Sequence, residues 1–337
     1  MTLTNLNEIA EYIVSNGKGI LAADESTGTI KKRFDSINTE STEQSRKTYR
    51  EMLFQADGMK GNIGGVILFE ETLKQISDDG TSLVKVISNQ GALPGIKVDK
   101  GLSPINDNSE ETVTNGLDDL DQRCKEYFEL GAKFTKWRAV INIGNDVPTD
   151  NCINENMHRL ANYAKIVQTN KMVPIVEPEV IMDGSHSIDE CYEVTSRVLK
   201  SLFKHLKDKN VDITGTILKP NMVISGNSCP IQAGVKEVAE KTVKCLLENV
   251  PEELPGITFL SGGQSDIDAT AHLDAMNKIG GFSWKLSFSY GRALQQAALK
   301  AWMGKEENMT NAKSAFSHRA LMNKKAALGN WNKDLEN

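Results

Sequence analysis

The chain has 337 residues, which is enough for one large domain or two small ones. Charged residues make up 25% of it and the net charge is −6, with both signs interspersed, so nothing indicates a nucleic-acid-binding protein. No segment has the length and apolarity of a membrane span, and the first residues lack the basic and apolar regions of a signal peptide. The 5 cysteines include no Cys-x-x-Cys pair, which is typical of a reducing compartment, and the 5 histidines include no His-x-x-x-His pair that would indicate a metal site.

Apolar runs that end in charged or polar residues recur along the chain, and amphipathic segments separate most of them. We interpret eight of these runs as strands: 19–25, 63–70, 94–99, 132–138, 173–179, 214–218, 257–263 and 284–292. Helical periodicity covers 2–16, 41–56, 116–130, 154–169, 188–208, 232–249, 265–278, 291–303 and 304–328, with a short helix near 71–77 or 81–87. Ser41 and Gln44 resemble a capping box at the start of the second of these helices.

This alternation of strands and helices predicts the fold class. Strands that alternate with helices favour a parallel sheet, and eight such units predict an α/β fold, a (β/α)8 TIM barrel with additional N- and C-terminal helices. We expect residues 1–328 to form this single barrel domain. Residues 329–337 are expected to form a short, loose tail.

The strand that ends at Lys219 carries the first indication of chemistry. Pro220 follows directly and cannot continue a ladder, so the lysine lies at the C-terminal rim of a strand. Such a lysine either reaches into solvent or, partly desolvated, serves as a nucleophilic amine that forms a Schiff base with a carbonyl. The other strands decide between these alternatives, because in a parallel barrel all C-terminal strand ends meet in one ring, where enzyme chemistry takes place.

The predicted strand ends are rich in charged and polar residues. They carry Asp24, Glu25, Glu70, Lys97, Asp99, Lys136, Arg138, Glu177, Glu179, Lys219, Ser261, Ser289 and Arg292. One or two of these charges could form ion pairs that only stabilise the barrel. So many charges converging on one mouth indicate an active site instead, since buried charges are rare.

Three of these residues are expected to meet. Residues i and i+2 share one face of a strand, so Lys136 points to the same side as Arg138, and Glu177 to the same side as Glu179. We expect Lys136 and Glu177 to approach Lys219, because their strands are neighbours. A second ammonium about 4 Å away would favour loss of the proton from Lys219. Glu177 is placed to move protons while the carbinolamine loses water, and the alternative for Lys136 is an ion pair with a strand-end acid.

Two stretches suit a phosphate group. Ser261, Gly262 and Gly263 follow one strand and precede a helix, so backbone N–H groups and the helix N-terminus can attract an anion. Gly291 and Arg292 end the last strand at another helix start, with a guanidinium for bidentate contact. Phosphate sites after the seventh and eighth strands recur in barrels of this type.

A second anion is expected across the mouth. Lys97 and Arg138 lie there, and Arg33, in a basic run after the first strand, could also reach in. The alternative for that run is a solvated helix face. These residues together predict a metal-free Schiff-base enzyme that acts on a phosphorylated ketone or aldehyde with two phosphates.

Several of these stretches resemble the class I fructose-bisphosphate aldolases. They are 19–28, 65–69, 95–101, 136–138, 173–179, 218–222, 259–265 and 288–294. The motif Leu218-Lys219-Pro220-Asn221-Met222 is highly specific, and the similarity runs from about residue 5 to about residue 328. The resemblance implies reversible cleavage of fructose 1,6-bisphosphate into dihydroxyacetone phosphate and glyceraldehyde 3-phosphate. It also implies no cofactor, sugar phosphates as ligands, and a cytoplasmic homotetramer in glycolysis and gluconeogenesis.

The resemblance also implies roles for individual residues. Lys219 forms the Schiff base, Glu177 is the general acid and base, Glu179 and Lys136 support it electrostatically, and Asp24 handles the hydroxyl proton during cleavage. The residues implied for the phosphate on the ketone side are Ser261, Gly262, Gly263, Ser289, Gly291 and Arg292. Those implied for the other end of the substrate are Arg33, Lys97 and Arg138.

The chain departs from the animal enzymes at its C-terminal end. Those enzymes carry a longer tail ending in a tyrosine that helps protonate the enamine, whereas no tyrosine follows Tyr290 here. Either another group protonates the enamine or that step is slow. Transaldolases and deoxyribose-phosphate aldolases are alternatives with one phosphate site, and a metal-dependent aldolase would need clustered histidines. A secondary scaffold role with cytoskeletal proteins, which some members of the family are thought to have, is an alternative from another class.

Overall fold

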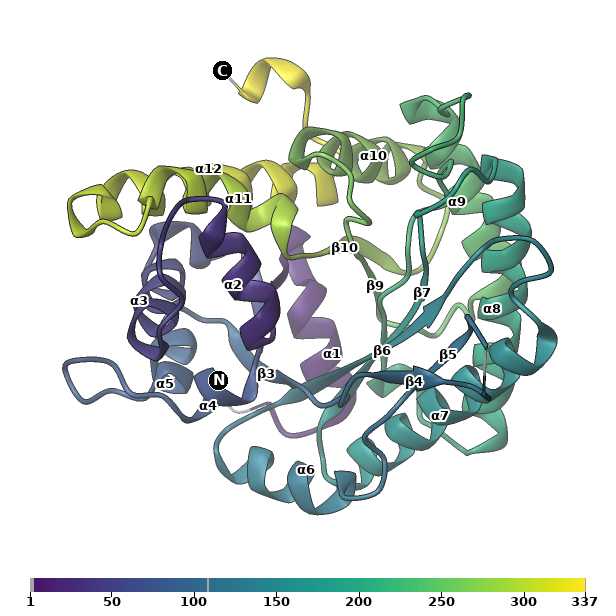
Figure 1. The fold of residues 1–337 in the computed structure, drawn as a ribbon, viewed down its shortest axis with the longest axis horizontal. Helices are drawn as coiled ribbons and strands as arrows, with labels where there is room; N and C mark the ends of the chain where they lie inside the picture. The colour runs from purple at the N-terminus through teal and green to yellow at the C-terminus, as the bar shows by residue number, and fades with distance from the viewer. Residues whose placement is uncertain (1–2, 108, 337) are drawn as a thin grey trace.

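The computed structural model describes residues 3–107 and 109–336, and its centre is a closed barrel of parallel strands (Figure 1). The strands follow one another around the barrel in the order β1-β10-β9-β8-β7-β6-β3-β2, so the predicted TIM-barrel architecture is confirmed. The barrel strands are β1 (Gly19–Ala23), β2 (Ile63–Leu68), β3 (Leu93–Lys97), β6 (Phe134–Ile141), β7 (Val173–Val180), β8 (Ile217–Leu218), β9 (Gly256–Phe259) and β10 (Lys285–Tyr290).

Helices surround the barrel on its sides and, through the first of them, at its N-terminal end. They are α1 (Leu6–Val14), α2 (Thr27–Asp35), α3 (Glu43–Phe54), α4 (Glu70–Lys74), α5 (Leu83–Asn89), α6 (Leu120–Glu129), α7 (Asp150–Thr169), α8 (Ile188–Asp208), α9 (Val235–Asn249), α10 (Asp266–Ile279), α11 (Arg292–Trp302) and α12 (Met309–Ala327). Among the described residues, no helix has the length and apolarity that crossing a membrane requires.

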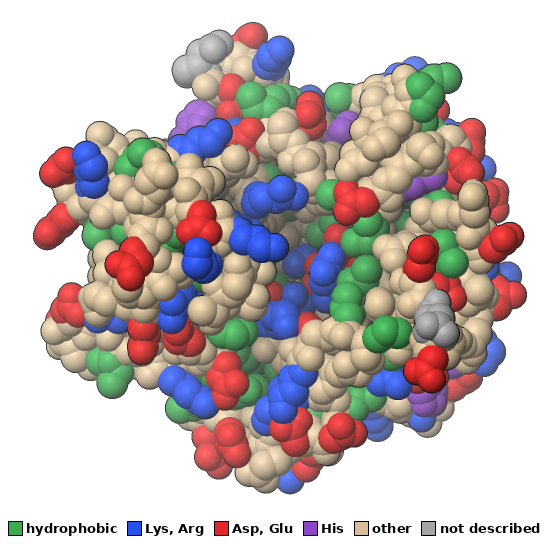
Figure 2. All heavy atoms as spheres, viewed as in Figure 1, with side chains coloured by type: hydrophobic (Ala, Val, Ile, Leu, Met, Phe, Trp, Pro, Cys, Tyr) green, Lys and Arg blue, Asp and Glu red, His purple; other side chains and the backbone are tan. Residues whose placement is uncertain are grey.

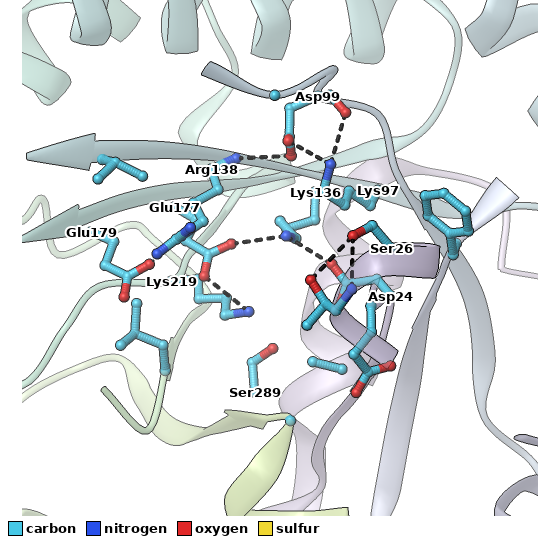
Figure 3. A pocket seen from close by; sticks show the side chains of 18 of the residues that line it. Asp24, Ser26, Lys97, Asp99, Lys136, Arg138, Glu177, Glu179, Lys219 and Ser289 are labelled. Atoms are coloured by element: carbon cyan, nitrogen blue, oxygen red, sulfur yellow. Dashed lines mark hydrogen bonds and ion pairs between the residues drawn. The ribbon is translucent and has the colours of Figure 1, made fainter. Parts of the chain in front are cut away.

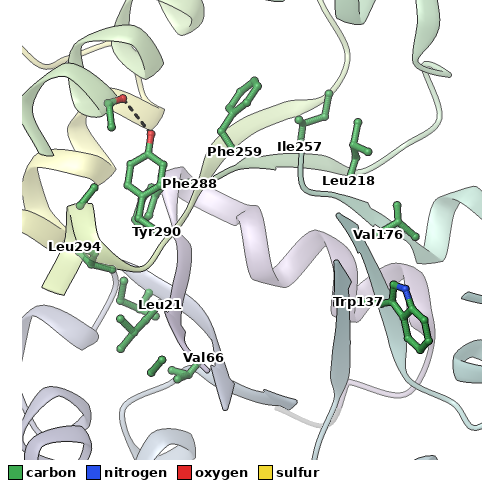
Figure 4. Close-up of a cluster of buried hydrophobic side chains, with 14 of the residues drawn as sticks. Leu21, Val66, Trp137, Val176, Leu218, Ile257, Phe259, Phe288, Tyr290 and Leu294 are labelled. Carbon is green, nitrogen blue, oxygen red and sulfur yellow. Dashed lines mark hydrogen bonds between the residues drawn. The ribbon is translucent and has the colours of Figure 1, made fainter. Parts of the chain in front are cut away.

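The apolar core has two parts. The larger part lies between the strands and the outer helices, where Trp137, Val176, Leu218 and Phe259 point away from the barrel axis (Figure 4). Trp137, for example, packs against Tyr163 of α7 with ring centroids 5.4 Å apart. Burying this apolar surface at about 25 cal/mol per Å² is the main force that holds the helices to the barrel.

The second part of the core fills the inside of the barrel at the N-terminal ends of the strands. Ile20, Phe134, Ile175 and Ile217 lie there, and α1 packs beneath them through Ile9 and Ile13. This contact needs a glycine in β2, because a Cβ at Gly64 would lie 2.0 Å from the carbonyl oxygen of Ile13. Helix α1 therefore closes the barrel at the end opposite to the C-terminal strand ends.

Several predicted boundaries were wrong. Strand β8 begins at Ile217 rather than at residue 214, because Ile213–Gly215 form a 3-10 turn in which the Asp212 side chain accepts from the Thr214 amide. The capping box of α3 consists of Thr42 and Ser45, not of Ser41 and Gln44. Both short helices offered as alternatives after the second strand exist, as α4 and α5. The hairpin of β4 (Leu102–Pro104) and β5 (Thr112–Thr114) was not predicted, and helix α2 was offered only as an alternative for the basic run that contains Arg33.

The segment after α12 is not loose. Trp331 is only 7% exposed, its backbone N–H donates to Asp274 of α10, and Glu336 forms an ion pair with Arg319 of α12. The expectation failed because one buried aromatic ring and one carboxylate hold this segment, and neither produces a periodic sequence pattern.

Candidate active site

The C-terminal ends of the barrel strands open into a cavity of about 750 Å³. Lys and Arg side chains surround the hollow in this face of the molecule (Figure 2). Every site residue predicted from the sequence lines this one cavity: Asp24, Arg33, Lys97, Lys136, Arg138, Glu177, Glu179, Lys219, Ser261, Gly262, Gly263, Ser289, Gly291 and Arg292.

The alternation of side chains along the strands brings the charges to this cavity. The inward-facing Ile217, Ile175 and Phe134 form part of the apolar barrel interior. Two residues further along, on the same strand face, come Lys219, Glu177 and Lys136. An apolar layer of side chains inside the barrel is thus followed, two residues closer to the C-terminal strand ends, by a layer of charged side chains.

Four of these groups form a chain of contacts at the bottom of the cavity (Figure 3). The Lys219 Nζ atom lies 3.1 Å from Oε1 of Glu177, and Nζ of Lys136 lies 3.3 Å from Oε2 of the same carboxylate. Lys136 Nζ also lies 2.8 Å from Oδ2 of Asp24. The expected meeting of the two lysines and Glu177 is therefore confirmed, and the alternative of an ion pair for Lys136 holds as well.

Neighbouring charges shift the pKa values of Asp24, Glu177 and Lys136. Burial disfavours the charged form of Asp24, but the ammonium groups of Lys136 and then Lys219 outweigh it and hold the pKa of Asp24 at about 2. The same balance keeps the pKa of Glu177 below its ordinary value. For Lys136, burial is outweighed by Asp24 and Glu177, which raise its pKa above the ordinary value. The two carboxylates thus favour the charged form of Lys136 between them.

The pKa of Asp24 predicts a pH effect on stability. Because this pKa is lowered from 3.8 to about 2, the ionised carboxylate stabilises the fold above pH 3.8, and the contribution is lost as the pH falls through about 2. Asp24→Asn is expected to lower the free energy of unfolding at pH 7 by about 2 kcal/mol and to flatten its pH dependence below pH 4. Urea unfolding followed from pH 7 to pH 2 measures both.

Asp78→Asn is the matched control, because the Asp78 side chain is 83% exposed and its ion pair with Lys47 contributes little. An Asp24→Asn protein with the unfolding midpoint of the unsubstituted protein at pH 7 would contradict the electrostatic account of the cluster.

The turn after β9 has the conformation that a phosphate-binding loop needs. Gly262 and Gly263 adopt positive φ angles of 51° and 71°, and the Gln264 amide donates to the Ser261 carbonyl oxygen. A Cβ at position 263 would also lie 2.2 Å from Cε of Met182, so the methionine side chain would have to move. The loop therefore presents backbone rather than side chains to the cavity.

The end of β10 offers further donors beside this loop. Gly291 precedes α11 without any side-chain cap, so the amides of the first helical turn are not used by a capping side chain. Ser289 is 1% exposed, and its Oγ atom has no hydrogen-bond partner. A buried hydroxyl without a partner costs free energy unless a ligand satisfies it.

The cations across the mouth are all paired with acids. Lys97 Nζ lies 2.6 Å from Oδ1 of Asp99, Arg138 pairs with Glu179 through its Nε atom, and Arg33 pairs with Glu25. An anion that binds there must compete with these carboxylates.

The chain is similar to known proteins over almost its whole length. Residues 5–337 match the family described as fructose-bisphosphate aldolase class-I. A relative from Xanthomonas campestris, described as a probable fructose-bisphosphate aldolase class 1, is 52% identical over 98% of this chain and 99% of its own. The cytosolic fructose-bisphosphate aldolase 4 of Arabidopsis thaliana is 52% identical over 97% of this chain and 84% of its own.

The chain belongs to the class I fructose-bisphosphate aldolase family. A solved structure agrees: fructose-bisphosphate aldolase from Plasmodium falciparum, in complex with TRAP and a small-molecule inhibitor, superposes with a TM-score of 0.95 at 48% identity, over 97% of this chain and 95% of that one. Within the described part of the chain, no three His, Cys, Asp or Glu side chains are grouped so that they could hold a metal ion.

Some residues that line the cavity were not predicted as site residues from the sequence. Ser26 and Thr29, at the start of α2, also line it. The serine caps α2, since its side chain accepts from the Thr29 amide. A serine just after a strand is a typical helix N-cap and could have indicated these residues. It was not recognised because α2 is too short and too polar to show helical periodicity.

Proposed function

We propose that the protein is a class I fructose-bisphosphate aldolase that works through a Schiff base on Lys219. It reversibly cleaves fructose 1,6-bisphosphate into dihydroxyacetone phosphate and glyceraldehyde 3-phosphate, in glycolysis and gluconeogenesis. The observation that carries the proposal is the buried contact of Lys219 with Glu177 at the bottom of a cavity with donors for phosphate. Membership of the family supports the same reaction.

The first half of the reaction forms the imine. Glu177, 3.1 Å from Nζ, takes a proton from the Lys219 ammonium group, and the resulting amine attacks the C2 carbonyl of the ketose. A proton passes from the attacking nitrogen to the C2 oxygen, which gives the carbinolamine. Glu177 then returns its proton to the C2 hydroxyl group, and water leaves as the protonated imine forms. Oε2 of Glu177 faces the Lys136 ammonium group at 3.3 Å, so the cation stays beside the carboxylate while it exchanges its proton.

The second half breaks the carbon–carbon bond. Asp24 is ionised at neutral pH and accepts the proton of the C4 hydroxyl. The C3–C4 bond breaks, its electron pair moves into the iminium as an enamine, and glyceraldehyde 3-phosphate leaves. Protonation at C3 and hydrolysis then release dihydroxyacetone phosphate and restore Lys219. The positive charge of Lys136 holds Asp24 and Glu177 in place throughout.

The remaining residues are assigned to binding. The residues assigned to the ketone-side phosphate are Ser261, Gly262, Gly263, Ser289, Gly291 and Arg292. The buried Ser289 hydroxyl, which has no hydrogen-bond partner, supports this assignment. Arg33, Lys97 and Arg138 bind the other end of the substrate by exchanging their carboxylate partners for phosphate oxygens. Glu179 is the partner that Arg138 releases when phosphate binds, and it supports Glu177 electrostatically.

The proposal extends to a cytoplasmic homotetramer. Free cysteines and relatives named as cytosolic aldolases support the compartment. A secondary scaffold role is kept because the Plasmodium falciparum relative was solved in complex with TRAP. Light scattering on the purified protein tests the tetramer.

Trapping the imine tests the mechanism. The protein is incubated with dihydroxyacetone phosphate, borohydride is added with and without EDTA, and peptides are examined by mass spectrometry. We expect a reduced adduct on Lys219 in both samples, since no step requires a metal, and loss of cleavage of fructose 1,6-bisphosphate after reduction. Absence of any adduct in folded protein would overturn the mechanism, whereas an adduct on another lysine would retain the chemistry and move the site.

A further inference from the structure

Arg319 of α12 connects the C-terminal segment to the first turn of α10. Its Nη1 atom donates to Oε2 of Glu336, and its Nη2 atom donates to the carbonyl oxygen of Asp266 at 3.2 Å and to Oγ1 of Thr270 at 2.6 Å. Arg319 is only 4% exposed. One buried guanidinium therefore spans two elements that are far apart in sequence.

The C-terminal segment holds its side of this bridge through further contacts. Trp331 donates through Nε1 to the other oxygen of Glu336 at 2.8 Å, and its backbone N–H donates to Oδ1 of Asp274 at 2.9 Å. Lys278 donates to the Trp331 carbonyl oxygen at 3.0 Å. The segment is thus held against α10, and both oxygens of Glu336 are fixed.

The first turn of α10 is continuous with the proposed phosphate-binding loop. Asp266 is the first residue of α10, Ser265 is its N-cap, and Gly263 lies two residues earlier. The loop is held on α10 through Gln264, whose side chain donates to the Ser261 carbonyl oxygen at 2.9 Å and contacts Nδ1 of His272 in α10. The position of the loop therefore depends on where α10 begins.

We propose that Arg319 and Glu336 are positioning residues that set the place of the Ser261–Gly263 loop for the ketone-side phosphate. This inference rests on the proposed function, because it assumes that the loop binds phosphate. A guanidinium suits the task because its planar set of donors reaches the carboxylate and the helix at the same time, which the single ammonium of a lysine cannot do.

The test uses two substitutions that preserve most of the packing, Glu336→Gln and Arg319→Lys. Both are expected to weaken binding of inorganic phosphate, measured by calorimetry, and to raise the KM for fructose 1,6-bisphosphate by about tenfold, with kcat changed less than about twofold. Arg319→Lys distinguishes an effect of the positive charge from an effect of the hydrogen bonds, since lysine retains the charge but cannot bond to Glu336 and α10 at the same time. Asp334→Asn, an exposed position of the same segment, is the matched control and should leave both values unchanged.

A ketone without phosphate distinguishes positioning from general loosening of the fold. Borohydride trapping with dihydroxyacetone should proceed equally in Glu336→Gln and the unsubstituted protein, while trapping with dihydroxyacetone phosphate at low concentration should be slower in the variant. Equal slowing with both ketones, or unchanged phosphate affinity in both variants, would refute the inference. If the unsubstituted protein binds no phosphate, or binds it equally well after Arg292→Ala, the proposed phosphate site itself fails and the inference falls with it.

Discussion

Replacing Lys219 by methionine is expected to reduce the rate of fructose 1,6-bisphosphate cleavage by about 10⁵-fold, because the covalent intermediate can no longer form. Methionine fills a similar volume and leaves Glu177 paired with Lys136 at 3.3 Å, so the barrel should still fold. The measurement is the rate of triose phosphate release, together with mass spectrometry after borohydride reduction. No adduct should be found at position 219.

Lys219→Arg serves as the charge-preserving comparison. Arginine keeps a cation beside Glu177 but is not deprotonated in proteins, so it cannot act as a nucleophile. We expect it to be as inactive as Lys219→Met. Lys85→Met, at an exposed position of α5, should have the activity of the unsubstituted protein. Substantial activity in Lys219→Arg would show that the charge, not the amine, is what the reaction needs.

Glu177→Gln is expected to slow cleavage by about 10³-fold, because the amide has the shape of the acid but cannot move protons during dehydration of the carbinolamine. The imine should still form, only slowly, so borohydride trapping with dihydroxyacetone phosphate is expected to reach the same final extent at a much lower rate. Rapid-quench trapping measures this rate directly.

Glu179→Gln is the informative comparison for this result. Glu179 lies two residues further along the same strand face but pairs with Arg138 rather than with Lys219. Its substitution should therefore affect the KM more than the rate of imine formation. Equal slowing of imine formation in the two variants would mean that the local charge, and not proton transfer by Glu177, controls dehydration.

The sequence was sufficient to predict the barrel and the gathering of charged residues at its C-terminal end, because both follow from short-range rules. Each strand is a buried run with a charged end, and the period of two places Lys219, Glu177 and Lys136 on inward faces. Parallel closure then brings these ends together without any further information.

The ion-pair partners, the start of β8 and the packing of the C-terminal segment could not be predicted, because they depend on tertiary contacts. The pairing of Arg33 with Glu25 and of Lys97 with Asp99 is decided by side-chain directions that no periodic pattern records. Strand β8 has two residues, too few for a pattern to mark its start. The C-terminal segment is held by Trp331 and Glu336, whose partners lie 57 and 17 residues away in sequence.

Helix α1 closes the N-terminal end of the barrel, and this determines the side from which molecules can reach the cavity. Ile9 and Ile13 fill the barrel from its N-terminal end, while the cavity that contains Lys219 lies at the C-terminal strand ends. We therefore expect the sugar, the water that hydrolyses the final imine and both products to pass through this one face of the barrel.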